Sequence, residues 1–104
     1  MDDHSVAGQL SILASQVNDL AVAATGEESR KLLSQQDALT QLALKAISAA
    51  LDAKAAAYAK TFKSLEDAIA SAEKSIGDIA NIEDTIKSVT KAINLATKLL
   101  KAVA

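Results

Sequence analysis

The stretch "LDAKAAAYAKTFK", residues 51–63, lies at the midpoint of the 104-residue chain and decides its fold. It contains no glycine, proline, asparagine or serine, the residues that most often mark turns or helix ends. A turn here would place the three alanines at 55–57 in loop conformations, against their strong preference for helix. The stretch therefore predicts a helix that continues through the middle of the chain.

Residues that can end a helix occur well to either side of this stretch. Upstream, "TGEE" at 25–28 offers Thr25 as a helix N-cap and Glu28 as its capping-box partner. Downstream, "GDIANIED" at 77–84 offers Gly77 as a helix end and Asn81 as the next cap. Three helices are predicted, at about residues 4–24, 27–76 and 81–103. At 1.5 Å per residue, the central helix would be roughly 75 Å long.

Composition supports an all-α fold in a single domain, residues 1–104. Alanine dominates the apolar half of the chain, proline is absent, and the only aromatic residues are Tyr58 and Phe62. From Leu44 onward, apolar residues recur every seven positions, which is typical of helices that pack at shallow angles. These positions are Leu44, Leu51, Tyr58, Leu65, Ala72, Ile79, Ile86, Ile93 and Leu100. We therefore expect an elongated antiparallel bundle with coiled-coil-like packing.

A central helix of this length could not be covered by its two neighbours alone. Its exposed apolar stripe predicts self-association, most simply as a dimer, or binding to another helical protein. The residues expected to form this packing surface are Leu39, Leu44, Ile47, Leu51, Tyr58, Phe62, Leu65 and Ile69. The expected function is that of a non-enzymatic scaffold or adaptor.

A compact four-helix bundle is the alternative architecture, because the chain divides into four segments of similar length. It requires one more turn in the middle of the chain. Ser64 and Asp67 could cap a helix that begins at residue 65. The alternative therefore predicts its turn near residues 61–64.

The C-terminal stretch "IKSVTKAINLATKLLKAVA", residues 86–104, is basic and amphipathic. Its apolar residues could face the bundle, with the lysines favouring the negative C-terminal end of the helix dipole. Alternatively, it could bind a membrane surface through its apolar face and its lysines. The residues for that alternative function are Lys87, Lys91, Lys98 and Lys101.

Signals for catalysis, cofactors and metals are missing from the sequence. There is no cysteine, the three glycines are isolated, and the one histidine, His4, has no identifiable partner. We therefore expect no enzyme activity, no cofactor and no metal. A net charge of −2 and the scarcity of aromatic residues argue against nucleic-acid binding. The acidic N-terminus does not resemble a signal peptide, and no apolar run is long enough for a transmembrane helix, which predicts a cytoplasmic protein.

Overall fold

The computed structural model describes residues 5–49, 51–52 and 54–102 of the chain. Within these residues it contains helices and no strands, so the predicted all-α class is confirmed. The α-helices are α1 (Val6–Ala23), α2 (Gly26–Ser48), α3 (Ala56–Gly77) and α4 (Ile82–Ala102). A short 3₁₀ helix, η1 (Ile79–Asn81), connects α3 to α4.

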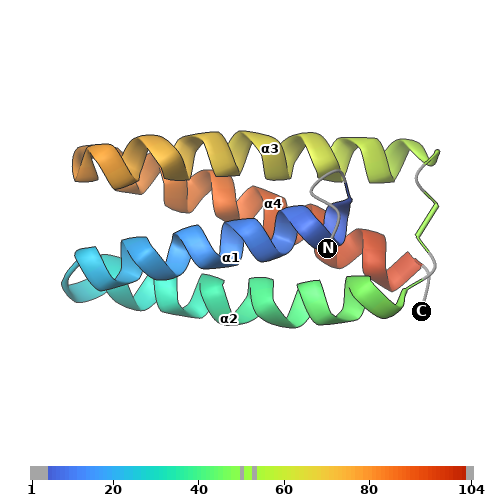
Figure 1. The fold of residues 1–104 in the computed structure, drawn as a ribbon, viewed down its shortest axis with the longest axis horizontal. Coiled ribbons are helices and arrows are strands. Elements are labelled where there is room, and N and C mark those ends of the chain that lie inside the picture. Colours follow the sequence, from blue (N-terminus) through green and yellow to red (C-terminus); the bar gives the residue numbers. More distant parts are fainter. Residues whose placement is uncertain (1–4, 50, 53, 103–104) are drawn as a thin grey trace.

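The helices form a bundle of two antiparallel hairpins, α1–α2 and α3–α4, that pack against each other (Figure 1). α1 lies against α2 and α3, and α4 lies against α3 and α2. As a result, α1 runs parallel to α3, and α2 runs parallel to α4 (Figure 1). The bundle measures 37 × 21 × 19 Å. α2 and α3 lie diagonally opposite each other in the bundle, so the chain changes sides between the end of α2 and the start of α3 (Figure 1).

The predicted continuous helix over residues 27–76 is wrong. α2 ends at Ser48 and α3 begins at Ala56, and the flanking residues Ala49 and Ala55 are extended, with ψ angles of 143° and 142°. The four-helix alternative has the correct number of helices. Its predicted turn near residues 61–64 is wrong as well, because Ser64 is buried within α3.

Asp52 forms the turn that helix propensity did not predict. Its Oδ1 accepts a hydrogen bond from the Lys54 N–H at 2.9 Å, and its carbonyl oxygen accepts one from the Ala55 N–H at 3.0 Å. Aspartate forms such local turns readily. The fold-back lets Leu39 and Leu65, both fully buried, share one core. Burying each leucine stabilises the folded chain by about 1.5–3 kcal/mol. This is more than the free energy by which a single alanine favours helix.

The outer two predicted helices correspond closely to α1 and α4, although residues 4 and 103 lie outside the described part of the chain. Thr25 precedes α2 as expected, but its side chain makes no capping hydrogen bond. Gly26 makes this turn with a φ of 61°, a left-handed conformation that favours glycine. Gly77 ends α3, and Asp78 then turns the chain by accepting a hydrogen bond from the Ala80 N–H at 3.1 Å.

The core consists of leucine, isoleucine, valine and alanine side chains. Large side chains come from α1, α2 and α4, whereas α3 contributes Leu65 and two alanines, and two further alanines come from α4. The fully buried members include Leu10, Leu13, Leu32, Leu39, Leu65, Ala68, Ala72, Ala92 and Ala96. Small side chains let α3 and α4 approach each other, which explains how an alanine-rich chain fills a bundle of this width.

Candidate functional site

The residues predicted to mediate self-association divide into three groups. Leu39 and Leu65 are fully buried in the core of the same chain. Four others are partly buried and pack against that core: Leu51, Tyr58, Phe62 and Ile69. Only Leu44 and Ile47 are exposed, at 64% and 57%. Because the chain turns back between α2 and α3, most residues of the predicted surface face the core. Leu44 and Ile47 are the two that remain available to a partner.

Leu33 joins these two residues on the side of α2 that faces away from the core, and its side chain is 52% exposed. It lies eleven positions before Leu44, or about three helical turns, which places both on one side of the helix. Between them on this side lie the uncharged Gln36 and Thr40 and one exposed acid, Asp37, whose Oδ2 accepts a hydrogen bond from Gln41 Nε2 at 3.2 Å. We call Leu33, Leu44 and Ile47 the outer face of α2. Sequence reasoning missed Leu33, although its spacing from Leu44 could have indicated it.

A second group of exposed apolar residues occurs where α1 and α3 end. Val22 is 80% exposed, Ile76 is 53% exposed, and Ile79 in η1 is 47% exposed. α1 and α3 run parallel, so their C-terminal ends lie at the same end of the bundle (Figure 1). These residues lie on three different elements, so they do not form a continuous stripe along one helix as the outer face of α2 does.

The lysines of the predicted membrane-contacting surface are exposed, but the apolar side of their helix is not. Lys87, Lys91, Lys98 and Lys101 all face solvent. Val89, Ala92 and Ala96, on the other side of α4, are fully buried in the bundle. Lysines from other helices lie nearby: Lys91 lines a groove with Lys60 and Lys63, and Lys101 lines one with Lys45. Contact of the apolar side with lipid would require α4 to leave the bundle.

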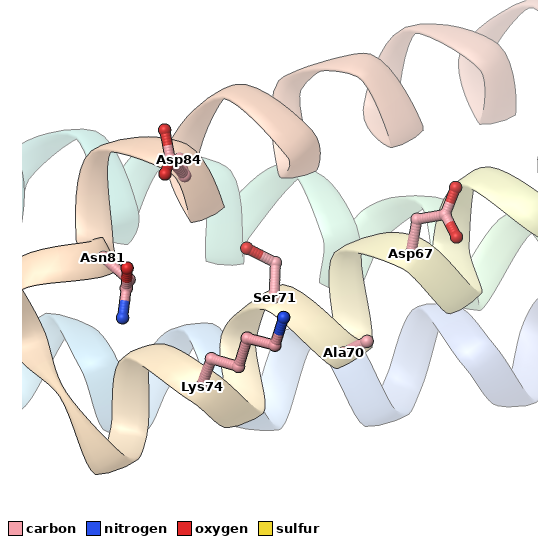
Figure 2. Close-up of a pocket in the computed structure, with 6 residues that line it drawn as sticks. All are labelled: Asp67, Ala70, Ser71, Lys74, Asn81 and Asp84. Atoms are coloured by element: carbon pink, nitrogen blue, oxygen red, sulfur yellow. The ribbon is translucent and has the colours of Figure 1, made fainter.

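A polar groove of about 280 Å³ lies between the second half of α3 and the start of α4 (Figure 2). Its lining includes Asp67, Ser71 and Lys74 from α3, Asn81 from η1 and Asp84 from α4. Asp67 already pairs with Lys63 at 3.3 Å. Carboxylate, amide and amine groups thus line an open groove, and none of these named residues is fully buried. The groove offers hydrogen bonds to water or a polar ligand without the desolvation that strengthens catalytic groups.

A cluster of hydroxyl groups lies beneath this groove, in the α3–α4 interface. The Thr85 hydroxyl donates to the Ser71 carbonyl oxygen at 3.0 Å. Its oxygen lies 2.9 Å from Ser71 Oγ and 2.6 Å from Ser75 Oγ, so it can accept from both. Thr85 and Ser75 are at most 1% exposed. The cluster satisfies its own hydrogen bonds and includes no base that could activate a hydroxyl, which indicates a structural role.

Two carboxylates meet where α2 and α4 begin, since these helices run parallel. A hydrogen bond with Glu83 raises the pKa of Glu28 above its ordinary value of 4.5; burial and repulsion by Glu83 act in the same direction, while Lys31 opposes them. The pair is open to solvent, and it connects the two hairpins at the end of the bundle opposite the 49–55 turn (Figure 1).

Among the described residues, no three histidine, cysteine, aspartate or glutamate side chains come together in a group that could hold a metal ion. His4 lies outside the described part of the chain. The described helices include none with the length and hydropathy needed to cross a membrane. No protein family model matches the chain, and the searches of curated proteins and of solved structures gave no significant match.

Proposed function

We propose that this protein is a non-enzymatic helical interaction module that self-associates and acts as a scaffold or adaptor. The observation that supports the proposal is the outer face of α2, where Leu33, Leu44 and Ile47 remain 52–64% exposed although the core is already complete. Exposed apolar side chains aligned on one face of a rigid helix are typical of an association surface. The six core-facing residues of the predicted surface stabilise the monomer in this proposal.

A second copy of the chain fits this face well. Apart from Asp37, the residues on this side of α2 carry no charge: Leu33, Gln36, Thr40, Leu44 and Ile47. An antiparallel pairing of two α2 helices centred near Thr40 would keep the two Asp37 carboxylates apart. A two-fold dimer brings the same surface of both copies together, which requires this kind of self-complementarity. Burial of leucine and isoleucine would supply the stabilising free energy.

The polar sites support the non-enzymatic part of the proposal. The buried hydroxyls of Ser75 and Thr85 bond to each other, and the groove above them is open to solvent. The Glu28–Glu83 carboxyl pair is also at the surface. None of these sites combines a nucleophile, a base and a water-excluded pocket, the combination by which an active site is recognised.

Sedimentation velocity tests the proposal with a double variant, Leu44→Gln with Ile47→Gln. Both positions are exposed, so folding should survive while association is weakened. Val22→Gln is a matched control, because Val22 is more exposed but lies on α1. We expect the wild type and the control to associate at micromolar concentration and the double variant to be monomeric. A monomeric wild type, or a double variant that associates as the wild type does, would contradict the proposal.

Binding to a membrane surface is the rival function, and it would use the apolar side of α4 with Lys98 and Lys101. That side is buried in the bundle, which favours self-association through α2. Flotation with anionic vesicles separates the two functions. Binding that is lost in a Lys98→Glu, Lys101→Glu variant would support the rival, whereas the absence of binding would remove it.

A further inference from the structure

The connection between α2 and α3 joins the two hairpins, and its sequence favours helix. Ala49, Leu51, Asp52, Lys54 and Ala55 lie between the two helices and are not helical. The segment 49–55 has neither glycine nor proline and is mostly alanine, leucine and lysine, which are good helix formers. Its local hydrogen bonds depend on Asp52. If the hairpins separated, this segment could become helical and join α2 to α3.

The buried sides of α2 and α3 would be aligned in such a joined helix. Leu39 and Ala68 are both fully buried, and they lie 29 positions apart, or about eight helical turns. Ala46 and Ala68 are 22 positions apart, or about six turns. An unbroken helix would therefore present the core residues of both segments on one side. In the monomer, the turn between α2 and α3 places the core residues of these two helices in opposite halves of one core.

The two interfaces that would separate contain the least satisfied polar groups of the described core. Gln35 of α2 donates through Nε2 to the Ile86 carbonyl oxygen and to Thr90 Oγ1 of α4, both at 2.9 Å, yet its Oε1 is buried without a partner. Gln16 of α1 reaches the Ile69 carbonyl oxygen of α3 at 3.5 Å, and its Oε1 is likewise unpaired. Each orphaned oxygen weakens the contact between the two hairpins, in the monomer and in an exchanged dimer alike, and so eases their separation.

We infer that two copies of this chain exchange hairpins, so that α1–α2 of one copy packs against α3–α4 of the other. The inference concerns self-association, as the proposed function does, but it places the contact on the inner faces of the hairpins instead of the outer face of α2. A short connection that holds back a favoured conformation promotes exchange of this kind.

A second copy is the partner that these inner faces fit best. The α1–α3 and α2–α4 contacts that close the monomer would form again between copies with the same side chains and the same hydrogen bonds. A separated hairpin would otherwise expose the leucines of its core, including Leu39 or Leu65, to water. The exchanged dimer would consist of two four-helix bundles joined by two long helices.

Proline at position 56 separates the closed from the exchanged form. Ala56 is exposed and is the first residue of α3, where proline is tolerated, and Ala55 already has the extended ψ that precedes proline. Inside a continuous helix, the same proline would remove a hydrogen bond and clash with the preceding turn. In the Leu44→Gln, Ile47→Gln background, where association through α2 is weakened, we expect Ala56→Pro to abolish the dimer formed after refolding at high concentration, while the matched control Ala56→Ser still forms it.

Deleting residues 49–55 tests the inference in the opposite direction. The deletion removes about two helical turns, so it keeps the faces of α2 and α3 aligned but leaves no residues to cross the bundle. In the same Leu44→Gln, Ile47→Gln background, we expect this deletion variant to be dimeric at every concentration measured by sedimentation. A folded monomer would overturn the inference.

Spin labels at Ser34→Cys and Glu73→Cys report the connection directly, since both positions are exposed and the chain has no native cysteine. Labelled chains are refolded with an excess of unlabelled chains, so that each dimer carries one labelled copy. The two sites would be about 58 Å apart along a continuous helix but closer than the 37 Å bundle length in the monomer. The long distance in the dimer fraction would support exchange.

A dimer that shows only the short distance would overturn hairpin exchange and leave association through α2 intact. If refolding gives no wild-type dimer and the deletion variant does not dimerise, exchange is also overturned. The Leu44→Gln, Ile47→Gln variant tests the proposed function separately, because these exposed residues take no part in the interfaces between the hairpins.

Discussion

The hydroxyl cluster between α3 and α4 leads to a quantitative prediction for Thr85→Val. Valine keeps the shape of threonine but removes the hydroxyl, which makes contacts of 2.6, 2.9 and 3.0 Å with Ser75 Oγ, Ser71 Oγ and the Ser71 carbonyl oxygen. Each neutral hydrogen bond contributes about 1 kcal/mol net, and a buried serine without an acceptor adds its own penalty. We expect a loss of about 2–3 kcal/mol in the free energy of unfolding.

Thermal unfolding followed by circular dichroism measures this loss. For a chain of this size, 1 kcal/mol corresponds to about 4–8 °C, so Tm should fall by roughly 10–20 °C. Thr40→Val serves as a control because Thr40 is exposed and its hydroxyl bonds to the Gln36 carbonyl oxygen of its own helix. The control should change stability by less than about 0.5 kcal/mol.

A double-mutant cycle with Ser75→Ala shows whether the hydroxyls act as a unit. When residue 75 is alanine, removal of the Thr85 hydroxyl no longer leaves a Ser75 hydroxyl buried without an acceptor. The double variant should therefore be more stable than the sum of the single effects predicts, by about 1 kcal/mol. Additive effects, or a Thr85→Val variant as stable as the control, would refute the network described here.

Three further predictions address other parts of the bundle. Leu65→Ala should lower the free energy of unfolding by about 2–5 kcal/mol in urea denaturation, because Leu65 is fully buried. Tyr58→Phe should loosen the start of α1, seen as faster hydrogen exchange at Val6, because the Tyr58 hydroxyl accepts from the Val6 N–H at 3.0 Å. Since the pKa of Glu28 is raised in the fold, its stabilising contribution is present at low pH and is lost as the pH rises through that pKa, above 4.5. Glu28→Gln should reduce this pH dependence in thermal unfolding, and an unchanged pH profile would contradict the carboxyl pair.

Local sequence signals predicted the helix boundaries that depend on nearby residues. The apolar spacing of α1 and α4 and the turns at Gly26 and Gly77 are encoded within a few positions, so the ends of these helices were found to within two residues. Even there, the details differ, because Thr25 makes no capping bond and Gly26 turns the chain instead.

The break between α2 and α3 could not be predicted in the same way. Helix propensity correctly describes residues 56–63, which are helical, but it extends the helix across 49–55. The free energy that opposes this extension comes from distant residues, when α3 folds back and buries Leu65 beside the core residues of α1 and α2. The one local indication was Asp52, whose turn-forming ability was outweighed by the surrounding alanines.

The candidate surface depends on the same turn. The seven-residue spacing placed Leu44 and Leu65 on one stripe, yet Leu44 is 64% exposed and Leu65 is fully buried. A pattern in sequence identifies which residues share a side of a helix, but only the three-dimensional fold determines which side is covered. The buried and partly buried hydroxyl-bearing residues of α3 could have been predicted from the sequence. They follow helical spacing beside the apolar residues, at Thr61, Ser64, Ser71 and Ser75.

Small-angle X-ray scattering of the Leu44→Gln, Ile47→Gln variant, which we expect to be monomeric, tests the central claim most directly, namely that the chain turns back between α2 and α3 and forms a compact bundle. The radius of gyration of the Cα atoms is 13.0 Å, and the hydrated monomer should scatter with a value only slightly larger. A continuous central helix of roughly 75 Å would by itself require a radius of gyration of roughly 22 Å. A monomer mass with the small value is the predicted result, and a monomer mass with the large value would contradict the account.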